Sequence, residues 1–162
     1  MPSSLLHALA DSHYVLPAGY TSAKSLLVTE RGGNSVGAVT IQVQGPKQHG
    51  LRYNGIVYYT VFRSAADAKA AAARPIGGPT ETLHVVARSV PGFSSFPGFR
   101  FSGTVIGTNK AGRKTTLTSS EASIADGSVA VLVQTINAPQ DEIPVLRSAV
   151  AHLQSAERLA TR

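Results

Sequence analysis

The chain has 162 residues, a formal charge of +6 and no cysteine. Its length fits a single domain, residues 1–162, that buries roughly 70% of its unfolded surface without cross-links. The missing cysteines exclude thiol catalysis, zinc–thiolate sites and iron–sulfur clusters, and no apolar run reaches the roughly 18 residues that a transmembrane helix needs.

The N-terminal part predicts a short helix followed by a β-hairpin. Leu5, Leu6 and Leu9 recur at helical spacing, so we expect an amphipathic helix that covers one end of the core. Two strands are expected over 25–29 and 36–43. The second of them alternates apolar and polar residues, which is typical of a strand with one buried and one wet face.

The run from Ile56 to Phe62 is the strongest strand signal in the chain. It consists almost entirely of β-branched and aromatic residues, so we expect a strand covered on both faces at the centre of a sheet. Ser64 then starts a helix, because its hydroxyl and the carboxylate of Asp67 suit the free N–H groups of a first helical turn. The poly-alanine body of this helix ends before Pro75.

The second half of the chain predicts four more strands and a final helix. Asp126-Gly127 is a type I′ turn sequence, so the last two strands should be antiparallel neighbours. The final helix should begin near Asp141, because Pro144 is tolerated only within a first turn. The strands are expected over 82–89, 100–108, 115–125 and 129–136.

These elements predict an α+β fold with one antiparallel sheet of six to seven strands and helices packed on it. Residues 19–75 and 92–158 follow one plan, in which strands lead to an apolar strand and then to a helix with a polar cap. We therefore expect two pseudo-symmetric strand-strand-strand-helix halves. The apolar strands 56–62 and 129–136 need cover on both faces. The helices therefore either divide between the faces or cover one face, while loops and the N-terminal helix cover part of the other.

This order of elements resembles the Mog1/PsbP-type α/β/α sandwich. The turn at 16–20, the strand-into-helix segment from Tyr59 to Asp67 and the terminal helix around 149–153 also resemble extracytoplasmic lipoprotein and kinase-sensor domains of actinobacteria. The sensor-type domains usually carry paired cysteines, which this chain lacks, and no functional residue of either group can be matched. The resemblance implies a non-enzymatic, exported binding domain. The low charge, the many Ser, Thr, Ala and Val residues and the absence of cysteine also suit an extracytoplasmic protein whose signal peptide has been removed, with a cytoplasmic location as the alternative.

Basic residues are concentrated in the middle of the chain. Between 47 and 114, ten Lys or Arg stand against two acids, an excess that favours anionic partners in general. His84 and Arg88 on one expected strand, with Arg100 and Lys110 nearby in sequence, form a candidate anion-binding patch, because arginine makes bidentate contacts with carboxylate or phosphate. The alternative is that these four are unrelated surface residues.

Two aromatic residues complete the candidate ligand-binding set. Phe96 lies in a loop over 91–99 with three phenylalanines, whose rings either plug the end of the core or line the mouth of a cleft. Tyr58 lies in the expected central strand. The chain has no nucleophile elbow, P-loop, dinucleotide fingerprint or H-E-x-x-H motif, and its acids are scattered, so we expect no cofactor and no metal.

The sequence favours a non-enzymatic binding or accessory protein that holds an anionic or apolar ligand, or a protein partner, on a sheet face or in an end cleft. One alternative is a cofactor-free enzyme in which His84 acts as acid or base and Tyr58 or Tyr59 orients the substrate. Nucleic-acid binding through the basic middle segment is disfavoured, because the aromatic residues it needs for stacking fall in runs that the core requires.

Overall fold

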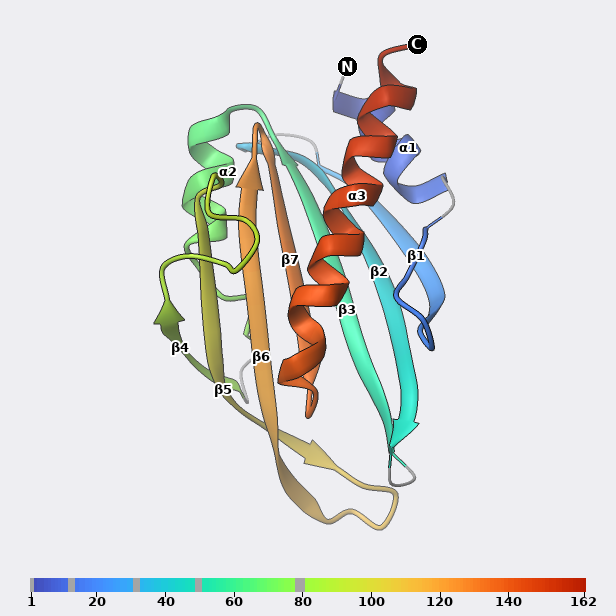
Figure 1. Cartoon of the computed structure of the whole chain (residues 1–162), viewed down its shortest axis with the longest axis vertical. Helices are drawn as coiled ribbons and strands as arrows, with labels where there is room; N and C mark the ends of the chain where they lie inside the picture. The colour runs from blue at the N-terminus through green and yellow to red at the C-terminus, as the bar shows by residue number, and fades with distance from the viewer. Residues whose placement is uncertain (1, 12–13, 31–32, 49–50, 78–80) are drawn as a thin grey trace.

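The fold is built on one antiparallel sheet with the strand order β1-β2-β3-β7-β6-β5-β4 (Figure 1). The computed structural model describes residues 2–11, 14–30, 33–48, 51–77 and 81–162, and within them the sheet has seven strands. The strands are β1 (Thr21–Thr29), β2 (Ser35–Gln48), β3 (Leu51–Phe62), β4 (Glu81–Ala87), β5 (Gly98–Thr108), β6 (Lys114–Asp126) and β7 (Val129–Ile136). The helices are α1 (Pro2–Asp11), α2 (Ala65–Ala72) and α3 (Glu142–Ala160), and a 3₁₀ turn at Pro139–Asp141 precedes α3.

The predicted α+β fold with one antiparallel sheet is confirmed. The expected central strand is β3, which lies between β2 and β7, and its Val57 and Tyr59 are fully buried. The expected antiparallel pairing of the last two strands is also present. Within the described residues, no helix is both long and apolar enough to cross a membrane.

The turn between β6 and β7 is centred one residue later than predicted. Asp126 pairs with Val129, so the two-residue loop is Gly127-Ser128 and not Asp126-Gly127. Gly127 has a φ of +53°, whereas Ser128 keeps a negative φ. A single positive φ at the first loop position fits a type II′ turn, which favours glycine there.

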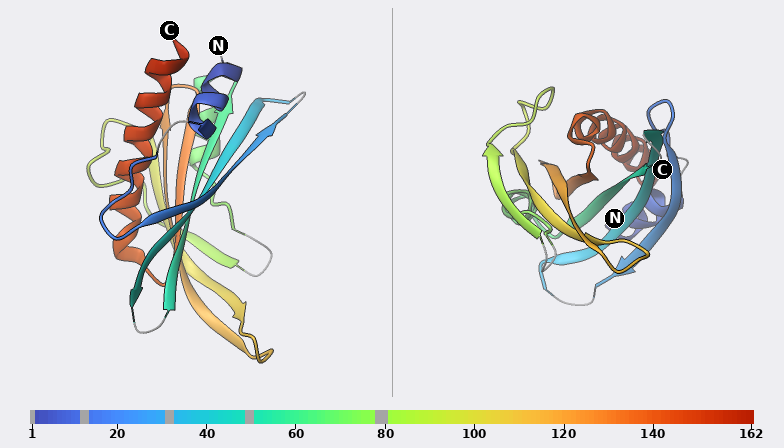
Figure 2. Two further views of the ribbon diagram at one scale, coloured as in Figure 1. Left: turned by 90° about the vertical axis from the view of Figure 1, so that its right-hand side faces the viewer. Right: turned by 90° about the horizontal axis from the view of Figure 1, so that it is seen from below.

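The helices divide between the two faces of the sheet. Figure 2 shows the sheet curling around α3, which defines the α3 face together with α1. Because side chains alternate along a strand, Val131 and Val133 of β7 join Leu146 and Leu153 of α3 in the main core on this face. Leu132, between the two valines, points to the opposite side, which is the α2 face.

Two polar side chains connect the main core to the helices. The Tyr59 hydroxyl donates to the carbonyl oxygen of Ala149 in α3 at 2.7 Å. In α3 itself, Nε2 of His152 lies 2.9 Å from the carbonyl oxygen of Leu9 in α1. His152 is buried, and its ring joins the two helices.

α2 packs on the opposite face through small residues. Its N-cap is Ser64, whose Oγ accepts from the Asp67 N–H at 3.1 Å, as the sequence predicts. Ala68 and Ala72 are fully buried and contact Ala125 of β6. Alanines let the helix approach the sheet closely, and the connection that leaves α2 runs across the same face.

The predicted correspondence between the two halves holds for the strands. β1-β2-β3 and β5-β6-β7 meet at the antiparallel β3–β7 pair, with β4 added at one edge. A twofold axis perpendicular to the sheet would place the helices after β3 and β7 on the same face. Since α2 and α3 lie on opposite faces, the correspondence does not extend to helix placement.

Candidate functional site

The candidate site lies on the α2 face, where three strands present one row of side chains. Tyr58 of β3 pairs directly with Leu132 of β7, and Leu132 pairs with Ser123 of β6. Paired residues in an antiparallel sheet point to the same face, with Cβ atoms about 5 Å apart. The register therefore places the phenol of Tyr58 and the hydroxyl of Ser123 on the two sides of one leucine.

A cavity of about 230 Å³ lies between this row and α2. Its floor is the sheet and its roof is the end of α2 with the connection that follows the helix. Pro75 fixes this connection as a helix terminator, since proline cannot continue the helical hydrogen-bond pattern. We call it the α2 pocket, and it is lined by Tyr58, Thr60, Ala71, Arg74, Pro75, Ile76, Ser123, Ala130 and Leu132.

The buried hydroxyl of Ser123 is the most informative atom of the α2 pocket. Ser123 is 1% exposed, and within the described residues its Oγ has no hydrogen-bond partner. A buried polar group without a partner costs about 1–3 kcal/mol of stability, so native proteins keep few of them. This one stands in a pocket wall, where a bound ligand can supply the missing hydrogen bond.

Four polar residues form a carboxylate cluster next to the α2 pocket: Glu81, Ser119, Glu121 and Gln134. Nε2 of Gln134 lies 3.1 and 3.0 Å from the two carboxylate oxygens of Glu81 and 3.3 Å from Oε1 of Glu121. It also lies 3.4 Å from Oγ of Ser119. One amide group with two N–H bonds thus serves two carboxylates.

The α2 pocket and the carboxylate cluster share the connection after α2. The backbone N–H of Ile76 donates to Oε2 of Glu121 at 3.0 Å, while the rest of Ile76 lines the pocket. Glu121 also precedes Ser123 by two residues on β6, so both side chains lie on the α2 face. The carboxylate cluster therefore places negative charge beside the floor of the α2 pocket.

Burial changes the acidity of this region. Glu121 is fully buried, and desolvation is the main cause that raises the pKa of its carboxyl from 4.5 to about 7, with the charges of Glu81 and Glu142 adding to the rise. The Ile76 N–H opposes it. The pKa of Tyr58 is raised too, first by desolvation and then by the negative charges of Glu121 and Glu81.

The structure separates most of the residues that the sequence offered as a site. His84 pairs with Ser102 on the α3 face and is exposed, and Arg100 lies on that same face, where its Nε is 2.6 Å from Oε1 of Glu142. Lys110 is exposed in the turn between β5 and β6, beyond both strands. These residues do not converge on the α2 pocket.

Arg88 differs from its expected place because of a β-bulge. The register of β4 shifts between Val85 and Ala87, and the strand ends at Ala87. The guanidinium carbon of Arg88 lies 6.0 Å from the ring centre of Phe99, which points to the α2 face. The expected placement of Arg88 beside His84 on one strand is therefore wrong.

The two aromatic candidates lie on different faces. Phe96 is half-buried against the main core, with its ring centre 6.3 Å from that of Phe93, so these rings plug the core as the first of the two predictions states. Tyr58 is half-buried in the α2 pocket. Of the six candidates, Tyr58 alone lines that pocket.

Sequence reasoning missed Ser123, Glu121, Gln134 and Arg74. A usable signal was present in the run Ser119-Ser120-Glu121-Ala122-Ser123, which places hydroxyls and an acid inside a strand expected to be paired on both sides. Buried acids in strands occur mainly where they are paired or functional. Within the described residues, no three His, Asp or Glu side chains gather as metal ligands would.

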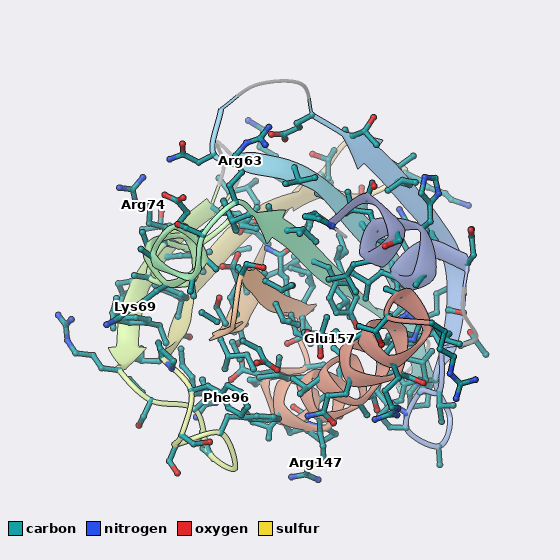
Figure 3. All side chains as sticks on the ribbon, turned by 90° about the horizontal axis from the view of Figure 1, so that it is seen from above. Arg63, Lys69, Arg74, Phe96, Arg147 and Glu157 are labelled. Atoms are coloured by element: carbon teal, nitrogen blue, oxygen red, sulfur yellow. The ribbon has the colours of Figure 1, made fainter. Side chains whose placement is uncertain are left out.

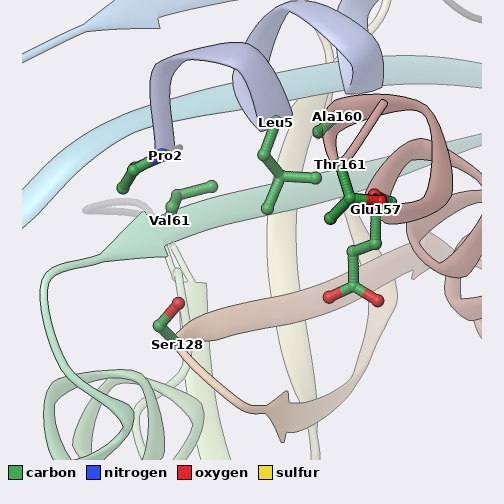
Figure 4. Close-up of a pocket in the computed structure, with 7 residues that line it drawn as sticks. All are labelled: Pro2, Leu5, Val61, Ser128, Glu157, Ala160 and Thr161. Atoms are coloured by element: carbon green, nitrogen blue, oxygen red, sulfur yellow. The ribbon is translucent and has the colours of Figure 1, made fainter.

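A second cavity of about 230 Å³ lies at the end of the α3 face, between the first turns of α1 and the last turns of α3 (Figure 4). Leu5, Val61 and Ala160 give it apolar walls, and Glu157 contributes a carboxylate. Desolvation and the charge of Asp126 raise the pKa of Glu157. We call it the end pocket, and none of the buried unpartnered polar atoms of the described residues lines it.

No protein-family model matches the sequence, and no curated protein matches it significantly. Among solved structures, the extracellular domain of PknH from Mycobacterium tuberculosis is similar, with a TM-score of 0.52 at 11% sequence identity. The match covers 96% of this chain and 91% of that one. It establishes a shared fold, and the resemblance to actinobacterial extracytoplasmic domains agrees with it at that level, whereas a Mog1/PsbP relationship stays a prediction.

Proposed function

We propose that this protein is a non-enzymatic, extracytoplasmic binding protein and that its ligand site is the α2 pocket. The observation that carries the proposal is the Ser123 hydroxyl, which is buried, without a partner among the described residues and part of the pocket wall. A pocket with apolar walls and a few polar groups is the usual form of a small-molecule site. The fold shared with an extracellular domain supports the extracytoplasmic location.

The geometry favours binding over catalysis. In the enzyme alternative His84 acts with Tyr58 or Tyr59, but His84 projects from the α3 face and Tyr58 from the α2 face. The Tyr59 hydroxyl is buried and engaged with Ala149. An acid–base residue has to reach the same substrate atoms as its partner, and His84 and Tyr58 lie on opposite sides of the sheet.

A fragment screen by two-dimensional NMR tests the proposal. We expect small molecules that bind to shift the backbone amides around Ser123, Leu132 and Ile76. Ala71→Leu fills the pocket from its roof, keeps a good helix former in α2, and should weaken binding about tenfold or more.

Ala70→Leu is the matched control, because Ala70 is exposed on the same helix and does not line the pocket. It should leave every affinity unchanged. If Ala71→Leu folds normally and the fragments bind it as tightly as the original protein, or if the shifts gather at the end pocket, the α2 pocket is not the ligand site.

A further inference from the structure

The surroundings of the α2 pocket have opposite charges at its two ends. At the floor, the phenol of Tyr58 lies within the field of two carboxylates, those of Glu121 and Glu81. At the mouth, Arg74 is exposed in the turn after α2. Figure 3 shows Arg74 and Lys69 projecting outward at α2, so these positive groups face solvent. The carboxylate of Glu121, in contrast, is buried in the sheet.

The walls between these ends are short and aliphatic. Ala71 and Ile76 form the roof, and Ala130 and Leu132 form the floor beside the hydroxyls. A cavity of about 230 Å³ is smaller than the roughly 300 Å³ at which sites for drug-sized ligands begin. The ligand must therefore be small, with an apolar part of a few carbons.

The polar atoms of the floor suit a hydrogen-bond donor. The hydroxyls of Ser123 and Tyr58 both accept hydrogen bonds, and the carboxylates beside them make the potential negative, which attracts an ammonium group and repels a carboxylate. The aromatic face of Tyr58 adds an attraction for a cation. An anion at the floor would lie next to buried Glu121 without a cation to balance it.

We infer that the ligand of the α2 pocket is an aliphatic α-amino acid, with its ammonium group at the Ser123 end, its side chain against Leu132 and its carboxylate toward Arg74. This inference rests on the proposed function and adds the chemical class of the ligand. The sequence favoured an anionic or apolar ligand or a protein partner, whereas the ligand inferred for this pocket carries both charges and an apolar side chain.

A series of four molecules with the same isobutyl group tests the inference by titration calorimetry near pH 8, where Glu121 is ionised. L-Leucine has both charges, isoamylamine keeps the ammonium group, isocaproate keeps the carboxylate, and isoamyl alcohol is neutral. We expect leucine to bind most tightly, isoamylamine about tenfold more weakly, and isocaproate weakest of all. Isocaproate binding as tightly as isoamylamine would overturn the inference.

Two charge variants test where the carboxylate and the ammonium group of the ligand lie in the pocket. Arg74→Gln should weaken leucine binding about threefold to tenfold and leave isoamylamine unchanged, because only leucine has a carboxylate at the mouth. Lys69→Gln is the matched control: Lys69 is an exposed cation on the same helix outside the pocket lining. Glu121→Gln should weaken leucine and isoamylamine alike, and equal loss with isoamyl alcohol would overturn the role of its charge.

The outcomes separate this inference from the proposed function. If a member of the series other than leucine binds best and Ala71→Leu abolishes that binding, the pocket is the site and the amino-acid assignment is wrong. If none of the four binds, the assignment is wrong, and the fragment screen alone decides on the pocket. If leucine binds with the expected order but equally to Ala71→Leu, both the assignment and the pocket fail.

Discussion

Glu121 and Gln134 face each other across β6 and β7, and the side-chain amide of Gln134 lies between the carboxylates of Glu121 and Glu81. Both residues are buried. The sheet therefore encloses an acid whose ionisation the fold disfavours. The ionisation of Glu121 therefore makes the stability of the protein depend on pH. The Ile76 N–H, which donates to Glu121, connects the same carboxyl to the roof of the α2 pocket.

The first prediction is that Glu121 destabilises the folded state above neutral pH. Its carboxyl binds a proton more tightly when folded, with a pKa of about 7 against 4.5, so the folded state holds the extra proton between these values. The contribution of Glu121 to the free energy of unfolding should be highest below about pH 4.5. It should fall by up to about 3 kcal/mol as the pH rises through 7.

Urea denaturation at a series of pH values measures this effect. Glu121→Gln removes the titrating group and keeps an oxygen for the Ile76 N–H, so its stability should exceed that of the original protein at pH 8 by on the order of 2 kcal/mol. Glu30→Gln, at an exposed position, is the control and should keep the original slope. An unchanged slope in Glu121→Gln would show that this carboxyl is already ionised below neutrality.

Tyr58 and Tyr59 are adjacent but should respond differently to loss of the hydroxyl. Tyr59→Phe removes the hydrogen bond to the Ala149 carbonyl at a fully buried position, which should cost about 1 kcal/mol of unfolding free energy. Tyr58→Phe acts at a half-buried position in the pocket and should change stability by less than about 0.5 kcal/mol. Chemical denaturation of the two variants side by side checks the difference, and equal losses would contradict it.

Much of the fold follows from local pattern. The uninterrupted apolar run of β3, the cap at Ser64 and the proline limit on α3 each depend on neighbours within a few residues, and each is present where predicted. The face on which α2 packs does not follow from the sequence. It depends on which side the connection after β3 turns to, and alanines fit either face.

The α2 pocket could not be predicted from local pattern, because its residues come together only through pairing between strands that are far apart in the sequence. Ser123 reaches Tyr58 through the β6–β7 and β7–β3 registers, and Ile76 reaches Glu121 through a connection that follows no sequence period. The β-bulge between Val85 and Ala87 interrupts the side-chain alternation on which the predicted position of Arg88 depended. Residue type and spacing therefore predicted Tyr58 as a site residue but did not predict Ser123, Glu121, Gln134 or Arg74.

Ser123→Ala should raise stability while it lowers ligand affinity. The substitution removes a buried hydroxyl that has no partner in the described residues and leaves the backbone and packing almost unchanged. We expect a gain of up to about 1 kcal/mol in unfolding free energy and a loss of affinity of about tenfold for leucine or the best fragment. Ser128→Ala, in the end pocket, is the matched control for affinity. A loss of stability in Ser123→Ala would mean that the hydroxyl is already satisfied.

The roof of the α2 pocket should depend on the cap at Ser64. A helix of eight residues whose buried contacts are alanines has little stability of its own. The two hydrogen bonds between Ser64 and Asp67 therefore contribute a large share of the stability of α2. Ser64→Ala should cost about 1 kcal/mol, whereas Ser64→Gly should cost only a few tenths, because glycine keeps the extended cap backbone accessible to water.

Native-state hydrogen exchange distinguishes local opening of α2 from global unfolding. In the original protein the amides of α2 should already exchange faster than those of α3, which the main core holds through Leu146 and Leu153, because α2 opens without global unfolding. Ser64→Ala should then accelerate exchange in α2 about fivefold. Ligand should restore protection in α2, since it binds only beneath a closed roof. Equal protection of α2 and α3 in the original protein would mean that α2 opens only when the whole fold does, and then the pocket has no separate entrance at its roof.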